Sequence, residues 1–184
     1  MTRLIPGNPN IHELGFVNPF FFITVEESKG NTPFHPSEQA TVGRTNGTAE
    51  RITYVSFNVP PIGNFPGATA DTKCFLLPLP DTIDKSGSKS LQIFSLASGF
   101  TLPTSLTFNT RPGPDQQLST VTYGDSNGIT PITMENPVKA ACHFGGKQEF
   151  LVRCTGDNAL FTFTTNPINT QPNGMVLVIG NVSN

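Results

Sequence analysis

The chain has 184 residues, enough to bury a hydrophobic core without covalent cross-links. Its formal net charge is −2, and charged residues make up 13% of it. Clustered Lys and Arg are the electrostatic footprint of nucleic-acid binding. Because the 11 basic residues here are scattered, the sequence argues against a nucleic-acid partner.

The rest of the composition indicates a β-rich protein. Gly and Pro number 17 each, Thr is prominent, and Phe is abundant at 15, which suits short strands and many turns. No segment approaches the roughly 18 apolar residues of a membrane-spanning helix, and the start, MTRLIPGNPN, lacks the apolar stretch of a signal peptide. Low charge with much Thr, Ser, Asn and Gly is typical of secreted proteins. We therefore expect that a signal was removed and that Met1 was added for expression.

The first third of the chain predicts two strands separated by a loop. Residues 1–19 contain three prolines and are predicted to form an irregular amino-terminal arm. The segment FFFITVEE (20–27) is apolar on both faces and predicts a central strand. A long polar loop over 28–50 follows, with a short strand near 40–43. The segment RITYVSFNV (51–59) alternates as a half-buried strand does, and a Pro-Pro pair ends it.

The remaining predicted strands are short and separated by turn signals. Asn127-Gly128 is the strongest short hairpin signal, and Thr155 to Asn158 predicts a second tight hairpin. The predicted strands are KCFLLPLP (73–80), SLQIFSLA (90–97), SLTFNT (105–110), STVTYG (119–124), ITPITM (129–134), QEFLVRC (148–154), ALFTFTT (159–165) and MVLVIG (175–180). About eight to ten short strands at this spacing predict an all-β, single-domain antiparallel β-sandwich or jelly roll over residues 1–184.

One stretch, AACHFGG (140–146), places a cysteine beside a histidine. On an extended segment Cys142 and His143 point to opposite faces, so the imidazole cannot take the thiol proton of its neighbour. A base would have to come from His12 or His35, and the sequence places neither near Cys142. No histidine spacing or carboxylate pair indicates a metal or glycosidase site. We therefore expect no catalytic residue, no metal and no cofactor.

The three cysteines allow one disulfide and one remaining thiol. A Cys142–Cys154 bridge would close a short loop between neighbouring strands. A Cys74–Cys142 bridge would join two distant strands and restrict the unfolded chain more. Cys154 lies on the same face as Phe150 and Val152, where a thiol behaves as a small buried hydrophobe. We prefer the Cys74–Cys142 pairing with Cys154 buried, and the shorter bridge is the alternative.

Modification and binding sites are less sharply indicated. Two N-glycosylation sequons occur, at Asn46 and Asn181, in turn-like or terminal surroundings. The sequence identifies no ligand-binding residue. If a ligand binds, the loops at one end of the sandwich are the expected place, and these loops are Asn31–Gln39, Asp81–Ser88 and Arg111–Gln116.

Several stretches, in this order, resemble the carboxyl-terminal domain of the fungal But-two family: FVNPFFFITVEESKGNTP, TNGTAERITYVSFNVPP, KCFLLPLP, AACHFGGKQEFLVRC and GMVLVIG. The resemblance covers most of residues 16–180. It implies that Cys74 and Cys142 match the two cysteines of the family, which supports their pairing. Cys154 has no counterpart, and His143 stands where the family has a proline. Most members look like secreted or surface proteins of filamentous fungi without an established enzymatic role.

Composition, sequons and resemblance together lead to one principal functional expectation and two alternatives. The principal one is a secreted, non-enzymatic β-sandwich glycoprotein of the fungal cell wall or surface, with a wall polysaccharide or a protein as its partner. The first alternative is an intracellular interaction module that docks a ubiquitin-like activating enzyme, as the namesake of the family does. The second is a secreted effector that binds a host ligand through the long 28–50 loop.

Overall fold

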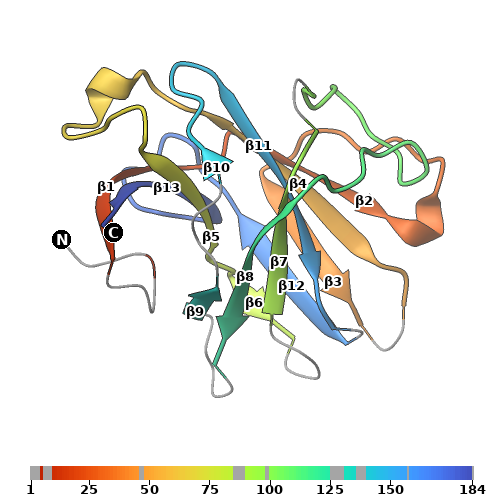
Figure 1. The fold of residues 1–184 in the computed structure, drawn as a ribbon. Helices are drawn as coiled ribbons and strands as arrows, with labels where there is room; N and C mark the ends of the chain where they lie inside the picture. The colour runs from red at the N-terminus through yellow and green to blue at the C-terminus, as the bar shows by residue number, and fades with distance from the viewer. Residues whose placement is uncertain are drawn as a thin grey trace.

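The computed structural model describes Ile5 and residues 10–45, 48–84, 90–97, 100–124, 131–135, 140–156 and 158–183. Regular structure among them is almost entirely β (Figure 1), and the two 3₁₀ turns, Glu27–Lys29 and Ile62–Asn64, have three residues each. The strands are β1 Ile11–Val17, β2 Phe21–Glu26, β3 Gln39–Arg44, β4 Arg51–Asn58, β5 Lys73–Pro78, β6 Thr82–Ile83, β7 Ser90–Ser95, β8 Gln117–Tyr123, β9 Pro131–Glu135, β10 Ala140–Ala141, β11 Lys147–Cys154, β12 Ala159–Thr164 and β13 Met175–Val182.

These strands form two antiparallel sheets. The smaller sheet has the order β1-β13-β5-β10, and the larger has the order β6-β12-β3-β4-β11-β7-β8-β9, with β2 also paired to β4. The predicted all-β antiparallel fold is confirmed. The structure has more strands than the eight to ten expected, partly because β6 and β10 have two residues each, too few to leave a periodic pattern in the sequence.

The main core lies between the two sheets and contains residues of both. Phe75 and Leu77 of β5 and Val178 of β13 pack with Phe57 of β4 and Phe150 of β11 in one cluster. The Tyr123 hydroxyl of β8 donates a 2.6 Å hydrogen bond to the Pro78 carbonyl of β5. This bond joins the sheets across the core and satisfies a polar group that is sealed from water.

A second, smaller core covers part of the outer face of the larger sheet. Ile23, Tyr54 and Leu151 point away from the main core and pack under Leu102 and Leu106, which come from the irregular segment between β7 and β8. Strands β2 and β4 are therefore buried on both faces. The continuous apolar run over 20–27 predicted this for β2. The half-buried strand predicted over 51–59 is wrong in this respect, because Leu102 and Leu106 cover the face that was expected to be exposed. The Tyr54 hydroxyl donates to the Pro112 carbonyl at 2.7 Å and fixes this covering segment to the sheet.

Strand β3 pairs with β12 along its whole length and pairs with β4 at a single glycine. Gly43 pairs with Leu160 of β12 and with Arg51 of β4. Its φ is +111°, and a Cβ there would lie 2.0 Å from the Ala159 carbonyl oxygen, so only glycine fits. The strand predicted near 40–43 is thus present within β3, and it is a central element of the larger sheet.

Two sequence-based predictions about strands are wrong. Residues 1–19 are not wholly irregular, because β1 pairs with β13 along most of its length. A register shift between Glu13 and Gly15 breaks the alternation that would have identified it. Residues 105–110 form no strand and make a single bridge, Leu106 to Phe34. Their apolar side chains cover the second core instead of a sheet position.

The tight hairpin predicted at Thr155 to Asn158 is also wrong. Strand β11 pairs with β4 and β7, whereas β12 pairs with β3 and β6. Both edges of β11 are already occupied, so the next strand must pair elsewhere. The Asn127-Gly128 turn lies outside the described residues, but the strands on either side of it, β8 and β9, do pair.

The two tyrosines give a test of both cores. Burial raises the pKa of Tyr54 and that of Tyr123 above the usual value near 10. The neutral phenols therefore stabilise the fold below about pH 10, and this contribution is lost as the pH rises further. The chain has two Tyr and no Trp, so an alkaline titration followed by phenolate absorbance reports these two groups. We expect no phenolate signal until circular dichroism shows unfolding. Ionisation near pH 10 in a folded protein would contradict the buried hydroxyls.

Candidate functional site

A disulfide joins the edge strand of the smaller sheet to its neighbour. Cys74 of β5 is bonded to Cys142, which directly follows β10, and their Cα atoms are 5.1 Å apart. Strand β10 otherwise pairs with β5 through only Ala140↔Cys74 and Ala141↔Lys73. The preferred pairing is confirmed and the Cys142–Cys154 alternative is wrong. Because its sulfur is in this bond, Cys142 offers no thiolate nucleophile.

Cys154 forms no disulfide and lies at the end of β11. It packs against the main core, as predicted from its place on the face of Phe150 and Val152, but it is only partly buried. Its sulfur accepts a 3.4 Å hydrogen bond from the Gly156 amide. The position at the strand end explains why its burial is incomplete.

The chain after Cys142 makes a tight turn that is held from several sides. The Gly146 amide donates to the His143 carbonyl at 3.1 Å, and the Gly145 amide donates to the Val59 carbonyl at 3.0 Å. Gly145 has a φ of +74°, which matches the third position of a type II turn and favours glycine. The Phe144 ring packs against Phe65 with centroids 5.9 Å apart. The disulfide and these contacts fix the turn relative to β5.

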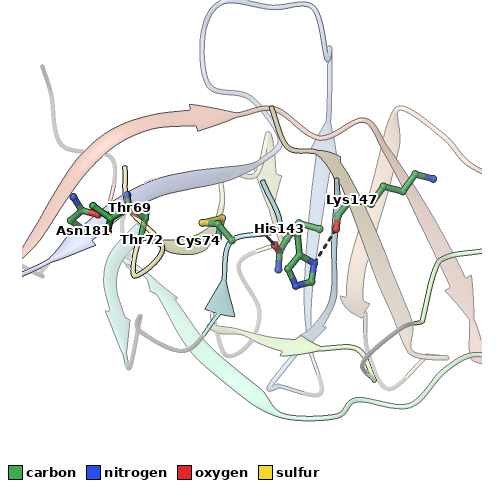
Figure 2. Close-up of a disulfide and its surroundings, with 8 residues drawn as sticks. Thr69, Thr72, Cys74, His143, Lys147 and Asn181 are labelled. Carbon is green, nitrogen blue, oxygen red and sulfur yellow. Dashed lines mark hydrogen bonds between the residues drawn. A yellow bond between two sulfur atoms is a disulfide. The ribbon is translucent and has the colours of Figure 1, made fainter. Parts of the chain in front are cut away.

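The turn positions the side chains of His143 and Gln148. His143 Nδ1 lies 3.2 Å from the Lys147 carbonyl oxygen (Figure 2), and because a carbonyl only accepts, Nδ1 carries the proton. The His143 amide donates to Gln148 Oε1 at 2.9 Å. Gln148 is 6% exposed and lies on the face of β11 that carries Phe150. A glutamine therefore stands among core residues with its amide orientation set by the turn.

A pocket opens at the seam where β10 and this turn face the ends of β7 and β8. Its volume is about 290 Å³, at the small end of the roughly 300–1,000 Å³ range of ligand sites. It combines apolar walls with ionisable and amide side chains. The lining residues are Ser95, Leu96, Ala97, Phe100, Thr101, Asp115, Gln116, Leu118, Ala140, Ala141, His143, Lys147, Gln148, Glu149 and Phe150.

The two carboxylates of the pocket have different surroundings. Glu149 accepts hydrogen bonds from the Ser56 hydroxyl at 3.0 Å and from the Leu102 amide at 2.8 Å, so both of its oxygens serve the protein. Asp115 is exposed, and its Oδ2 accepts a long 3.4 Å bond from the Ser95 hydroxyl. Asp115 is therefore the carboxylate that an entering ligand can reach, while Glu149 holds the covering segment at Leu102.

Of the three loops predicted to surround a ligand, one reaches the pocket. Asp115 and Gln116 of the Arg111–Gln116 loop line it. The Asn31–Gln39 loop lies over the second core instead, where the Phe34 amide donates to the Leu106 carbonyl at 2.7 Å. The Asp81–Ser88 loop begins with β6, at the far edge of the larger sheet, and its residues 85–88 lie outside the described residues.

The two sequons fall in different parts of the chain. Asn46 lies outside the described residues. Asn181 belongs to β13, not to a turn, where its Oδ1 accepts from the Thr72 hydroxyl at 2.6 Å and its Nδ2 donates to the Gly67 carbonyl at 3.0 Å. Figure 2 shows Asn181 beside Thr72 and Thr69, on the side of Cys74 away from His143. Glycosylation at both positions stays a prediction.

Sequence reasoning missed most of the pocket residues. Phe100, Lys147 and Glu149 carry no local pattern that marks them as a site. Gln148 does carry one, because it is a polar residue at the position where the alternation of β11 requires an apolar one. The pocket is assembled from three segments that are distant in sequence, and only the fold brings them together.

The fold and the site together define an antiparallel β-sandwich with a disulfide-anchored pocket at the seam of its two sheets. No family model and no curated protein sequence matches the chain. Among the residues that the structure describes, no group of three His, Cys, Asp or Glu side chains could hold a metal ion. In the same residues, no helix is long and apolar enough to cross a membrane.

The disulfide gives a stability prediction. Its two cysteines are 68 residues apart in sequence, so removing the bond frees a long loop in the unfolded chain. We expect the double variant Cys74→Ser/Cys142→Ser to lose about 2–5 kcal/mol of unfolding free energy in denaturant titrations. Cys154→Ser is the matched control and should lose much less. Equal losses in the two variants would contradict a structural role for the bond.

The two adjacent glycines of the turn give a matched pair of variants. A Cβ at Gly145 meets no atom within 4 Å, so Gly145→Ala adds only the strain of a positive φ, about 1–2 kcal/mol. A Cβ at Gly146 lies 3.5 Å from the His143 carbonyl, an ordinary contact, and that residue has no positive φ. We expect thermal unfolding to show a clear loss for Gly145→Ala and little change for Gly146→Ala. The reverse order would mean that the turn has another conformation.

Proposed function

We propose that the protein is a secreted, non-enzymatic binding protein of the fungal cell wall or surface, and that its ligand is a wall polysaccharide. The observation that carries the proposal is the Cys74–Cys142 disulfide. Structural disulfides form and persist in oxidising compartments and are rare in the cytosol. This bond attaches an edge strand and one wall of the pocket to β5. Because the bond persists only in an oxidising compartment, the pocket wall is fixed only there.

The pocket chemistry supports binding more than catalysis. Both oxygens of Glu149 are engaged with the protein. His143 Nδ1 is engaged with a backbone carbonyl, which leaves Nε2 as the nitrogen that can accept a proton. An acid/base pair needs groups that can exchange protons with a substrate. The lining groups that remain for such exchange are Asp115 and His143 Nε2, and among the described residues no hydrogen bond links these two side chains into a pair. A rigid pocket with amide, carboxylate and aromatic side chains is instead the usual make-up of a small-molecule or saccharide site.

The low charge of the surface agrees with a neutral insoluble ligand. Charged residues make up 13% of the chain, and the net charge is −2. A protein with few charges is not drawn to polyanions by long-range attraction, so contact with its ligand depends on hydrogen bonds and packing. Neutral wall polysaccharides offer hydroxyl groups and apolar sugar faces, and these are the groups that such a surface can bind.

The test has two parts and uses protein from its native source or from a secreting host. We expect peptide mass spectrometry under non-reducing conditions to find the Cys74–Cys142 peptide pair. We also expect the protein to be retained by insoluble glucan or chitin preparations. Three reduced thiols in native protein would overturn the proposal and favour the intracellular module that docks a ubiquitin-like activating enzyme. Complete failure to bind wall preparations would also count against it.

A further inference from the structure

We propose that the pocket at the seam of the sheets is a subsite for one uncharged sugar unit. This inference rests on the proposed function, since it names the place where a polysaccharide would be held. It is carried by the amide of Gln148, by the charge balance of the lining and by the aromatic ring of Phe100.

The amide of Gln148 has a donor that no group among the described residues uses. Oε1 accepts from the His143 amide, and Nε2 has no hydrogen-bond partner among the described residues. In these residues no side-chain nitrogen or oxygen that is sealed from solvent lacks a partner. Because Gln148 is 6% exposed and lines the pocket, Nε2 reaches solvent through the pocket. It is a fixed donor on the pocket wall that a ligand oxygen can satisfy.

The ionisable side chains around the pocket favour a neutral ligand. Asp115 and Glu149 carry negative charge, while Lys147 supplies one positive charge. Lys147 and Asp115 are both exposed, so water screens both of these charges. Glu149 is partly buried behind the pocket wall, where a second anion would be repelled more strongly. An acidic sugar would therefore be disfavoured, whereas a neutral hydroxyl can donate to Asp115 and accept from Gln148 Nε2.

An apolar surface completes the site. The Phe100 ring is 37% exposed and belongs to the lining, together with Leu118, Ala140 and Ala141. A sugar ring has hydroxyl groups at its rim and C–H groups on its faces, so it needs polar partners and an apolar wall together. The volume of about 290 Å³ matches one sugar unit better than an extended chain. The ligand is therefore expected to enter as a chain end or a side branch.

The direct test follows the side-chain amide signal of Gln148 by NMR, in the full chain with its disulfide intact. The probes are soluble neutral gluco-oligosaccharides and chito-oligosaccharides, with oligogalacturonides as the acidic comparator. We expect one of the neutral series to shift the Gln148 side-chain resonance in a saturable way and the acidic series to shift it much less. No shift with either neutral series, or a stronger response to the acidic one, would overturn the inference.

A matched pair of Phe variants supplies the second readout. Phe100→Ala removes the apolar wall, whereas Phe20→Ala removes a ring that is 49% exposed and lies outside the pocket lining. We expect Phe100→Ala to weaken oligosaccharide binding about tenfold and Phe20→Ala to leave it unchanged. Gln148→Met, which keeps the volume but deletes the donor, should weaken binding about two- to tenfold. Thermal unfolding confirms that each variant used is folded, and Phe100→Ala keeps the test open if Gln148→Met does not fold.

The outcomes separate this inference from the proposed function. Loss of oligosaccharide binding in Phe100→Ala but not in Phe20→Ala supports the subsite. Wild-type retention on walls with unchanged binding in Phe100→Ala and Gln148→Met overturns the subsite and leaves the wall-binding function standing. Reduced thiols in the native protein, together with a saturable Gln148 response to neutral sugar in the disulfide-bonded chain, would overturn the secreted function while supporting the subsite.

Discussion

The covalent bond between Cys74 and Cys142 is the constraint on which the candidate site depends. Strand β10 pairs with β5 through two residue pairs only, far less than an edge strand needs to hold its place by hydrogen bonds alone. The disulfide supplies the missing attachment at the end of that strand. The disulfide helps to fix the segments on both sides of Cys142. Before it lies the pocket wall formed by Ala140 and Ala141. After it come the turn of His143 to Gly146 and the Gln148 amide that this turn orients. The pocket is therefore a product of the fold and of one redox-dependent bond.

The two cores explain why the pocket lies where it does. The larger sheet is buried on its inner face by the smaller sheet and on part of its outer face by the irregular segment that contains Leu102 and Leu106. That segment begins beside the pocket, at Phe100 and Thr101, and the Leu102 amide is held there by Glu149 of β11. One carboxylate thus fixes the start of the outer cover and forms part of the pocket lining. The pocket therefore lies where this cover begins, beside β10 of the smaller sheet.

The sequence predicts strands that carry a local pattern of apolar residues. It does not predict which strands pair when the partners are distant in the sequence. Strands β4, β5, β11 and β13 were predictable because alternation or continuous apolar runs mark them. The hairpin at Thr155 to Asn158 was wrong because turn residues cannot reveal that both edges of β11 are taken. Strand β1 was missed because a register shift at Glu13 breaks its period. The cysteine pairing was predictable, but the pocket was not, since Phe100, Asp115 and Gln148 come from three separate segments. Gln148, a polar residue at a position of β11 that faces the core, could have indicated the pocket, but no prediction was based on it.

The fixed orientation of the Gln148 amide reduces the entropy that its donor would lose when a ligand binds. A glutamine side chain on a surface must give up rotamer freedom when it binds, and a ligand has to offset that cost. Here Oε1 is already held by the His143 amide, the turn is fixed by Gly145 and the Phe144–Phe65 contact, and the disulfide fixes the start of the turn. The cost of ordering the amide is therefore met on folding and not on binding. A single hydrogen bond to a neutral oxygen, which would be worth little on a flexible loop, can then contribute nearly its full strength at this position.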